Sequence, residues 1–217
     1  PALVRGIVAI AWYGIQTYLA SISLELLLMR IFPPMQHWTA SFVGLRLSGW
    51  VAFLILSGIQ LIIVWRGMEA VRHFQGAAGP IIWVIMIGLG VWMLSQAGWD
   101  FRWTVNADNV TPPIGTQFYQ IFVTVGLTSG TLATLMLNFS DFARYAPSRR
   151  SVVMGNILGL PLNWTAFALT SVLCSAAAIK VYGEAFHDPG DLLSRIDNDV
   201  VFYVVSIAFI VATVGGN

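Results

Sequence analysis

A tryptophan and a glutamine four residues apart are the first residues in this chain that could recognise a ligand. The chain reads Trp12-Tyr-Gly-Ile-Gln16 inside an uncharged run. On a helix, positions i and i+4 share one face. An indole offers a flat stacking surface, and an amide offers a donor beside an acceptor. The pair suits a planar ring with adjacent N–H and C=O groups, but core packing and a hydrogen bond between helices would use the same residues.

A run of glycine and hydroxyl residues interrupts another apolar segment. Residues 117–145 are apolar enough to cross a bilayer, yet their middle reads Gly126-Leu-Thr-Ser-Gly130-Thr131. Glycine weakens a helix, and non-helical backbone at membrane depth persists only inside protein or against a water-filled cavity. Secondary transporters often build substrate sites from broken helices of this kind. The alternative is a glycine-rich face that packs against another helix.

Three charged residues within or beside apolar runs are candidate gate residues. A carboxylate inside the membrane, such as Glu25, is a functional candidate by default, and an ion pair with Arg30 is the favoured alternative. Asp141 and Arg144 are three residues apart at the end of the interrupted segment. They suit either an intracellular gate or a local ion pair of small energy.

Composition decides which elements must position these residues. The chain has 217 residues, of which 57% are hydrophobic and 10% charged, against about 25% charged in ordinary soluble domains. Six apolar runs are near the roughly 20 residues that span hydrocarbon: residues 3–28, 47–65, 74–97, 118–139, 152–179 and 200–216. We predict an all-α, multi-pass integral membrane protein with about six transmembrane helices.

The chain is expected to form a single polytopic membrane domain, residues 1–217, that is incomplete at both ends. It begins at Pro1 and stops at Asn217, directly after an apolar run. Arginines cluster at Arg66 and Arg72 and again at residues 144–150, and these clusters favour the cytoplasmic side. The first residue would then lie inside the cell.

The other reactive side chains give no sign of catalysis. Cys174 is the single cysteine and lies in an apolar run, and the 3 histidines stand in separate connections without metal-ligand spacing. There is no nucleophile–base pair and no phosphate-binding loop. The net charge of +1 gives no reason to expect a nucleic-acid partner. We therefore expect neither an enzyme nor a metal site or cofactor.

Three segments resemble a known transporter family. Residues 1–17, which include Trp12 and Gln16, resemble the third transmembrane helix of the nucleobase:cation symporter-1 family. Residues 132–145 resemble its sixth helix, and residues 212–217 resemble the start of its eighth. The segments occur in the family's order. The resemblance implies a LeuT-like fold of five plus five helices in inverted repeats, of which this chain would hold helices three to eight.

The family resemblance also implies a function and a substrate site. Members import nucleobases, hydantoins, allantoin and related compounds with sodium or protons. Trp12 matches the family's stacking tryptophan, Gln16 matches its ring-binding amide, and Asn217 matches an asparagine of the eighth helix. The break of the sixth helix corresponds to Gly130 and its neighbour Thr131. Leu132 stands where hydantoin transporters have a second tryptophan, which argues against bulky aryl-hydantoins.

The resemblance gives a weaker account of the coupling ion. Ala212 could offer a carbonyl oxygen to a cation, with Thr213 beside it. Gly215 and Gly216 align where sodium-coupled members have hydroxyl ligands. Sodium prefers oxygen ligands of this kind, so the loss of two hydroxyls makes proton coupling comparably well supported.

The sequence therefore predicts a secondary transporter of a planar nitrogen heterocycle that works as a monomer in the cell membrane. We expect this membrane to be a bacterial inner membrane. Competing interpretations are an uncoupled facilitator or channel, a nontransporting receptor, and a degenerate fragment of a transporter. Saturable uptake that depends on an ion gradient would separate the first from the others.

Overall fold

The computed structural model describes the backbone of residues 2–100, 113–137, 139–184, 186 and 189–215. Side chains are described for the same residues except 2, 5, 131–137, 141, 142 and 189. The elements in chain order are α1 (Ala2–Ile31), η1 (Pro33–His37), β1 (Ser41–Phe42), β2 (Leu45–Arg46), α2 (Leu47–Trp65), α3 (Met68–Gln96), α4 (Ile114–Leu137), α5 (Phe139–Ala143), α6 (Arg149–Ile157), η2 (Leu158–Leu162), α7 (Asn163–Tyr182), α8 (Pro189–Ser194) and α9 (Asp199–Gly215).

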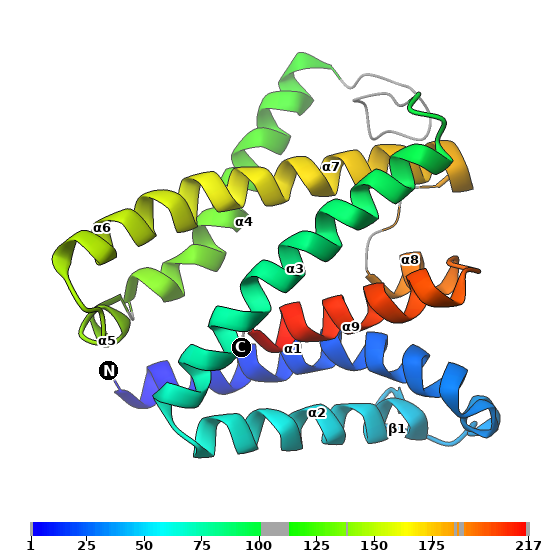
Figure 1. The fold of residues 1–217 in the computed structure, drawn as a ribbon, viewed down its shortest axis with the longest axis horizontal. Coiled ribbons are helices and arrows are strands. Elements are labelled where there is room, and N and C mark those ends of the chain that lie inside the picture. The colour runs from blue at the N-terminus through cyan, green and yellow to red at the C-terminus, as the bar shows by residue number, and fades with distance from the viewer. Residues whose placement is uncertain (1, 101–112, 138, 185, 187–188, 216–217) are drawn as a thin grey trace. The chain divides into compact units, whose positions relative to one another are not determined.

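Each of the six expected spans coincides with a long helical segment (Figure 1). Four helices in the described part of the chain are long and apolar enough to cross a membrane: Gly6–Ile31, Leu47–Trp65, Met68–Gln96 and Arg149–Tyr182. The helix Asp199–Gly215 is apolar but shorter. The protein is thus helical, as predicted, and the arrangement is that of a multi-pass membrane protein.

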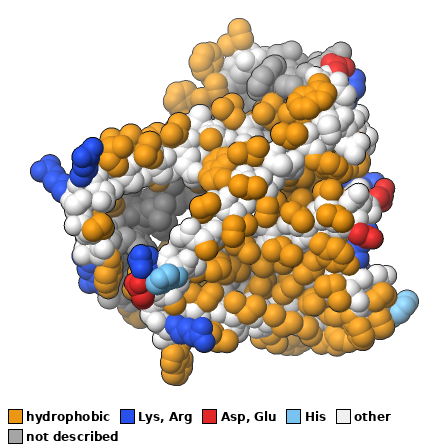
Figure 2. All heavy atoms as spheres, in the orientation of Figure 1, with side chains coloured by type: hydrophobic (Ala, Val, Ile, Leu, Met, Phe, Trp, Pro, Cys, Tyr) orange, Lys and Arg blue, Asp and Glu red, His pale blue; other side chains and the backbone are white. Residues whose placement is uncertain are grey.

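The surface has the character of a membrane protein. Apolar side chains cover most of the face seen in Figure 2, while charged side chains are few. Large hydrophobic residues stand fully outward, such as Trp65, which is 92% exposed. Monomeric soluble proteins rarely carry such continuous apolar surface. Lipid is the solvent that suits these helices.

The helices group into two compact units, the first made of Pro1–Met93 and Phe186–Asn217 and the second of Leu94–Ala185. In the first unit, α1 packs against both α2 and α9, and α8 packs against α1 and α9. The core between α1 and α2 is formed by Ala20, Leu24, Ala52 and Leu56. The two alanines are almost completely buried. Small side chains let membrane helices approach closely.

A tight hairpin turns the chain from η1 into α2. Strands β1 and β2 pair antiparallel, with Ser41 opposite Arg46 and Phe42 opposite Leu45. The two residues between them, Val43 and Gly44, both have positive φ angles, 50° and 81°. Two residues of this conformation make the turn whose twist matches a hairpin. Helix α2 therefore returns alongside α1.

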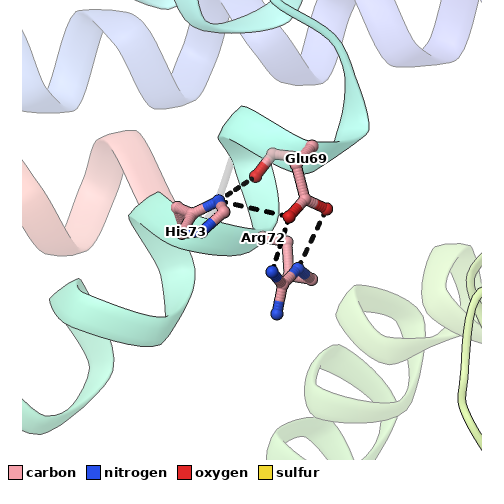
Figure 3. A network of polar contacts seen from close by, with 3 residues as sticks. All are labelled: Glu69, Arg72 and His73. Carbon is pink, nitrogen blue, oxygen red and sulfur yellow. Dashed lines mark hydrogen bonds and ion pairs between the residues drawn. The ribbon is translucent and has the colours of Figure 1, made fainter.

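The start of α3 carries an exposed polar network (Figure 3). The guanidinium of Arg72 donates to both carboxylate oxygens of Glu69, at 2.5 and 3.0 Å. The His73 Nδ1 atom lies 2.8 Å from the Glu69 carbonyl oxygen. All three side chains lie on one turn of the helix and are exposed, so the ion pair between Arg72 and Glu69 adds little stability.

The second unit contains a long helix with one irregular turn. Ser148 caps its start, since its hydroxyl accepts a hydrogen bond from the Ser151 amide at 3.1 Å. α6 then runs through a π-helical turn, η2, directly into α7. Pro161 lies in this turn and has no N–H to donate. π-Helical turns are rare and occur mostly as single turns inside α-helices, as this one does. Near the other end, Lys180 pairs with Asp100 at 2.8 Å.

One prediction about the backbone is wrong. The run from Gly126 to Gly130 lies inside α4, which is a continuous α-helix from Ile114 to Leu137. A glycine costs a helix only about 1 kcal/mol relative to alanine. Hydroxyl residues can also bond back within the helix, as Thr124 does to the Gln120 carbonyl at 2.8 Å. Two glycines and three hydroxyl residues are therefore not sufficient to break this segment.

Candidate functional site

Trp12 and Gln16 lie one turn apart on the unbroken helix α1, so they share a face as predicted. Trp12 is 38% exposed and Gln16 is half-buried. Both side chains therefore retain surface that a ligand or another helix can cover. The residues between them, Tyr13, Gly14 and Ile15, continue the helix without interruption.

Contacts at the far end of α1 join it to the start of α9. Arg30 forms an ion pair with Asp199 at 2.7 Å and donates to the Ile196 and Asp197 carbonyls at 3.1 and 3.0 Å. Its guanidinium also lies 4.4 Å from the centre of the Phe202 ring. Further along α1, Ile210 and Val214 of α9 pack against the cluster that contains Ala20 and Leu24. Trp12 lies beyond this cluster and keeps 38% of its surface exposed.

The same contacts set the register of α9 along α1. The two helices run antiparallel, with the start of α9 beside Arg30 and its end toward the N-terminal half of α1 (Figure 1). Asp199 and Gly215 are sixteen residues apart, about 24 Å along a helix. The same distance along α1, counted from Arg30 toward the N-terminus, reaches Gly14. The predicted ion residues at the end of α9 thus lie level with Trp12 and Gln16.

The described ion-site residues already have partners. Thr213 donates its hydroxyl to the Phe209 carbonyl at 2.7 Å, one turn earlier in the same helix. The Gly215 carbonyl accepts a hydrogen bond from the Gln75 amide on α3. Ala212 is half-buried on α9. A hydroxyl that donates keeps lone pairs free, so Thr213 can still offer an oxygen.

Gln75 was not among the predicted site residues. A Cβ at position 215 would lie 3.4 Å from the Gln75 Oε1 atom, so Gly215 leaves room for the amide to approach. The two residues are 140 positions apart. No local pattern links them, and only the packing of α3 near the end of α9 reveals the pair.

A buried polar cluster between α1 and α2 was also missed. Thr17 is fully buried, and its one hydroxyl hydrogen has two acceptors within reach, the Tyr13 carbonyl at 2.7 Å and the Gln60 Oε1 atom at 3.1 Å. The Tyr13 hydroxyl lies 3.5 Å from the Ser57 carbonyl. Gln60 is the one amide side chain in the α2 run. An amide side chain inside a membrane span needs a hydrogen-bond partner. The presence of Gln60 in this run was therefore the feature of the sequence that could have predicted the cluster.

The expected ion pair between Glu25 and Arg30 is wrong. The Ser48 hydroxyl of α2 donates to Glu25, whereas Arg30 is held by Asp199 of α9. Five residues on a helix correspond to about 140° of rotation. The two side chains therefore leave α1 in different directions and meet different helices.

The remaining predicted residues belong elsewhere or lie outside the described part. Gly130 is helical in the second unit, and so is the backbone of Thr131 and Leu132, whose side chains are not described. Gly216, Asn217 and the Asp141 side chain also lie outside the described residues. Arg144 lies 4.9 Å from the Tyr145 ring and donates to its hydroxyl at 3.1 Å. The structure thus places Trp12 and Gln16 on one face of α1 and brings the end of α9 against Gln75 of α3.

No group of three or more potential metal ligands occurs among the described residues. Glu25 lies on α1, whereas the network of Glu69, Arg72 and His73 in Figure 3 lies on α3. The arrangement around Trp12 offers stacking surface, amides and backbone oxygens, which are groups that bind a neutral polar molecule.

Comparison with known proteins assigns the chain to a family. The family described as permease for cytosine/purines, uracil, thiamine, allantoin matches residues 1–217. The chain belongs to this permease family. The resemblance to the nucleobase:cation symporters is thereby confirmed, and the family is one of permeases.

Individual permeases match along the whole chain. The allantoin permease of Bacillus subtilis (strain 168) is 32% identical over 231 residues, which covers 100% of this chain and 44% of that protein. The purine-uracil permease NCS1 of Arabidopsis thaliana is 28% identical over 220 residues, covering 100% and 36%. The uracil permease of Saccharomyces cerevisiae is 22% identical over 229 residues, covering 100% and 36%.

The chain spans less than half the length of each of these permeases. No solved structure matches the chain significantly. The relatives are named as permeases for allantoin, uracil and purines, which supports a transporter of the nucleobase type.

Proposed function

We propose that the full-length protein is a secondary transporter that imports a compact planar nitrogen heterocycle by cation-coupled alternating access. One observation carries the proposal. In a chain that matches a permease family over its whole length, Trp12 and Gln16 share one face of the unbroken helix α1 and keep surface that a ligand can cover. This face offers an aromatic ring for stacking and an amide that can both donate and accept hydrogen bonds.

The substrate would stack on the Trp12 indole and bond through its edge to Gln16. An amide both donates and accepts, so it matches a ring edge with neighbouring N–H and C=O groups. Asn217 would add hydrogen bonds from the direction of α9. The family resemblance adds Gly130, Thr131 and Leu132 as substrate-binding candidates, and a leucine at position 132 would leave one ring face of the substrate without an aromatic partner.

Substrate release toward either side would follow from helix movement, with no covalent step. The gate candidates are Glu25, Asp141 and Arg144. For the coupling ion we favour a proton over sodium. The Gly215 carbonyl already accepts from Gln75, and neither Gly215 nor Gly216 carries a hydroxyl for a cation.

The protein would act as a monomer in the cell membrane, and in a bacterium this is the inner membrane. Its partners would be the substrate and the surrounding lipid. Each function here belongs to the full-length protein, of which this chain is the part that holds α1 and α9.

The test is uptake by the full-length protein in proteoliposomes. Radiolabelled uracil, cytosine and allantoin would each be supplied with an inward pH gradient, with an inward sodium gradient and with none. Saturable accumulation against the substrate gradient supports the proposal. Equilibration without accumulation indicates an uncoupled facilitator, and binding without movement indicates a receptor; either result contradicts it.

A further inference from the structure

Glu25 meets α2 at a site built from small residues. It is one of two charged residues in the span Gly6–Ile31 and is half-buried. Its Oε1 atom accepts a hydrogen bond from Ser48, whose side chain is fully buried. A Cβ at position 49 would lie 3.1 Å from the Glu25 Oε2 atom, so Gly49 leaves room for the carboxylate.

No cation neutralises this carboxylate within the described part of the chain. The titratable or charged groups on and beside the elements packed around α1 are His37 at the end of η1, Arg46 before α2, Arg66 after α2, Asp191 in α8, Arg195 after α8, Asp197 before α9, Asp199 at its start and Tyr203 within it. Among the described residues, none of them is in ion-pair contact with Glu25, and Arg30 is engaged with Asp199. Glu25 thus depends on a neutral hydroxyl.

The Glu25 carboxylate lies beside the N-terminal end of α2, since its oxygens meet Ser48 and the space at Gly49 in the first turn of that helix. The N-cap residue of α2, Arg46, makes no side-chain cap bond of its own.

The contact with Ser48 survives in either protonation state. A serine hydroxyl donates to a carboxylate and accepts from a protonated carboxyl group. A proton can therefore bind to and leave a Glu25 oxygen without loss of the link between α1 and α2. What changes is one unit of charge at the interface of the helix that carries Trp12 and Gln16.

We propose that Glu25 is a proton-binding site whose protonation is coupled to transport. The site lies at the start of α2, near one end of the spans, where water can deliver the proton. Gain of the proton removes a charge from the α1–α2 interface, and its release restores the charge. The inference rests on the proposed transport function and names the group that binds the coupling ion.

The experiment compares two modes of transport in proteoliposomes that hold the full-length protein. Accumulation of labelled substrate under an inward pH gradient needs proton coupling, whereas exchange of labelled for unlabelled substrate at equal pH does not. Glu25→Gln keeps the size and hydrogen-bonding ability of the side chain but cannot be protonated. We expect accumulation to fall at least tenfold while exchange stays within twofold of the unmodified protein. Substrate-induced proton uptake, followed with a pH dye, should vanish.

Two further variants complete the design. Glu25→Asp retains a titratable carboxyl group and should keep gradient-driven accumulation above the level of Glu25→Gln. Glu69→Gln makes the same chemical change on the exposed first turn of α3, where the carboxylate is 67% exposed. Accumulation by this control should match that of the unmodified protein.

Several results would overturn the inference. The first is that Glu25→Gln accumulates substrate as well as the unmodified protein does. The second is that Glu25→Gln loses exchange as well as accumulation. The third is that transport by the unmodified protein responds to a sodium gradient but not to a pH gradient. If the unmodified protein moves no heterocycle at all, the proposed transport function fails instead, and this is seen before any variant is compared.

Discussion

At the scale of single residues, Trp12 and Gln16 combine stacking and hydrogen bonding on one turn of α1. Both side chains lie on one face of the helix and keep exposed surface in the described structure. A partly exposed indole in a membrane helix is ordinary when it faces lipid, so replacement of Trp12 is the experiment that distinguishes a lipid-facing residue from a substrate-binding one.

Replacement of Trp12 by alanine should weaken substrate binding by the full-length protein about tenfold or more. Stacking on an aromatic side chain contributes about 1–3 kcal/mol, and 1.4 kcal/mol corresponds to a factor of ten. Trp12→Phe should keep part of the affinity. The measurement is a binding titration with purified protein.

Trp65→Ala is the matched control, because Trp65 ends α2 and is 92% exposed. Its affinity should equal that of the unmodified protein. Normal binding and uptake by Trp12→Ala at normal expression would show that the substrate site lies elsewhere.

Leu132 should set the size of substrate that the transporter accepts. A leucine packs on a ring by dispersion but lacks the flat, quadrupole-matched face of an indole. Compact rings such as uracil, cytosine and allantoin should compete for uptake better than hydantoins with aryl groups. Leu132→Trp should shift the preference toward the aryl compounds, as measured with unlabelled competitors on both proteins. Tight competition by a benzyl-hydantoin alone in the unmodified protein would contradict this reading.

At the scale of elements, the α1–α2 pair is held by small residues and polar contacts at several levels. Thr17 meets Gln60 in the middle, Glu25 meets Ser48 toward one end, and alanines pack between them. All of these contacts require that α1 and α2 approach each other closely. Any added volume at the interface must separate the helices or displace a side chain.

Two glycines of α2 allow a controlled test of this packing. A Cβ at Gly49 would lie 3.1 Å from both the Glu25 Oε2 atom and a Leu45 methyl group, whereas a Cβ at Gly58 has nothing within 4 Å. We expect Gly49→Ala to be less stable than Gly58→Ala by about 1–3 kcal/mol, the usual cost of overpacking. The measurement is thermal unfolding of the full-length protein in detergent. Equal melting temperatures for the two variants would show that the α1–α2 contact is looser than described.

At the scale of the whole molecule, the end of α9 and its contact with α3 bear on ion coupling. The Gly215 carbonyl is engaged by Gln75 and the adjoining hydroxyl of Thr213 is bonded within its helix. A sodium ion prefers several oxygen ligands. A proton needs only one titratable group.

Uptake should therefore respond to a pH gradient at least as strongly as to a sodium gradient. Vesicles with the full-length protein would be given an inward sodium gradient at fixed pH, and then an inward pH gradient without sodium. The initial rate of substrate uptake is compared between the two conditions. Strong and saturable stimulation by sodium at fixed pH would reverse the preference for protons.

The sequence alone determined the class of the protein and the positions of its helices. Apolar runs of membrane length are local properties, and so is the four-residue spacing that puts Trp12 and Gln16 on one face. The family resemblance was also readable from short segments, because its motifs are local. The backbone of α4 was misjudged, since a glycine-rich pattern permits a break without requiring one.

Only the tertiary structure decided which side chains meet. Arg30 bonds to the Ile196 carbonyl 166 residues away, which leaves Glu25 with Ser48. Gln75 reaches Gly215 across 140 residues, and no pattern in either segment anticipates it. Such contacts depend on how whole helices cross and in what register. A sequence read one helix at a time lists the polar groups that need partners, but the packing of the helices selects the partners.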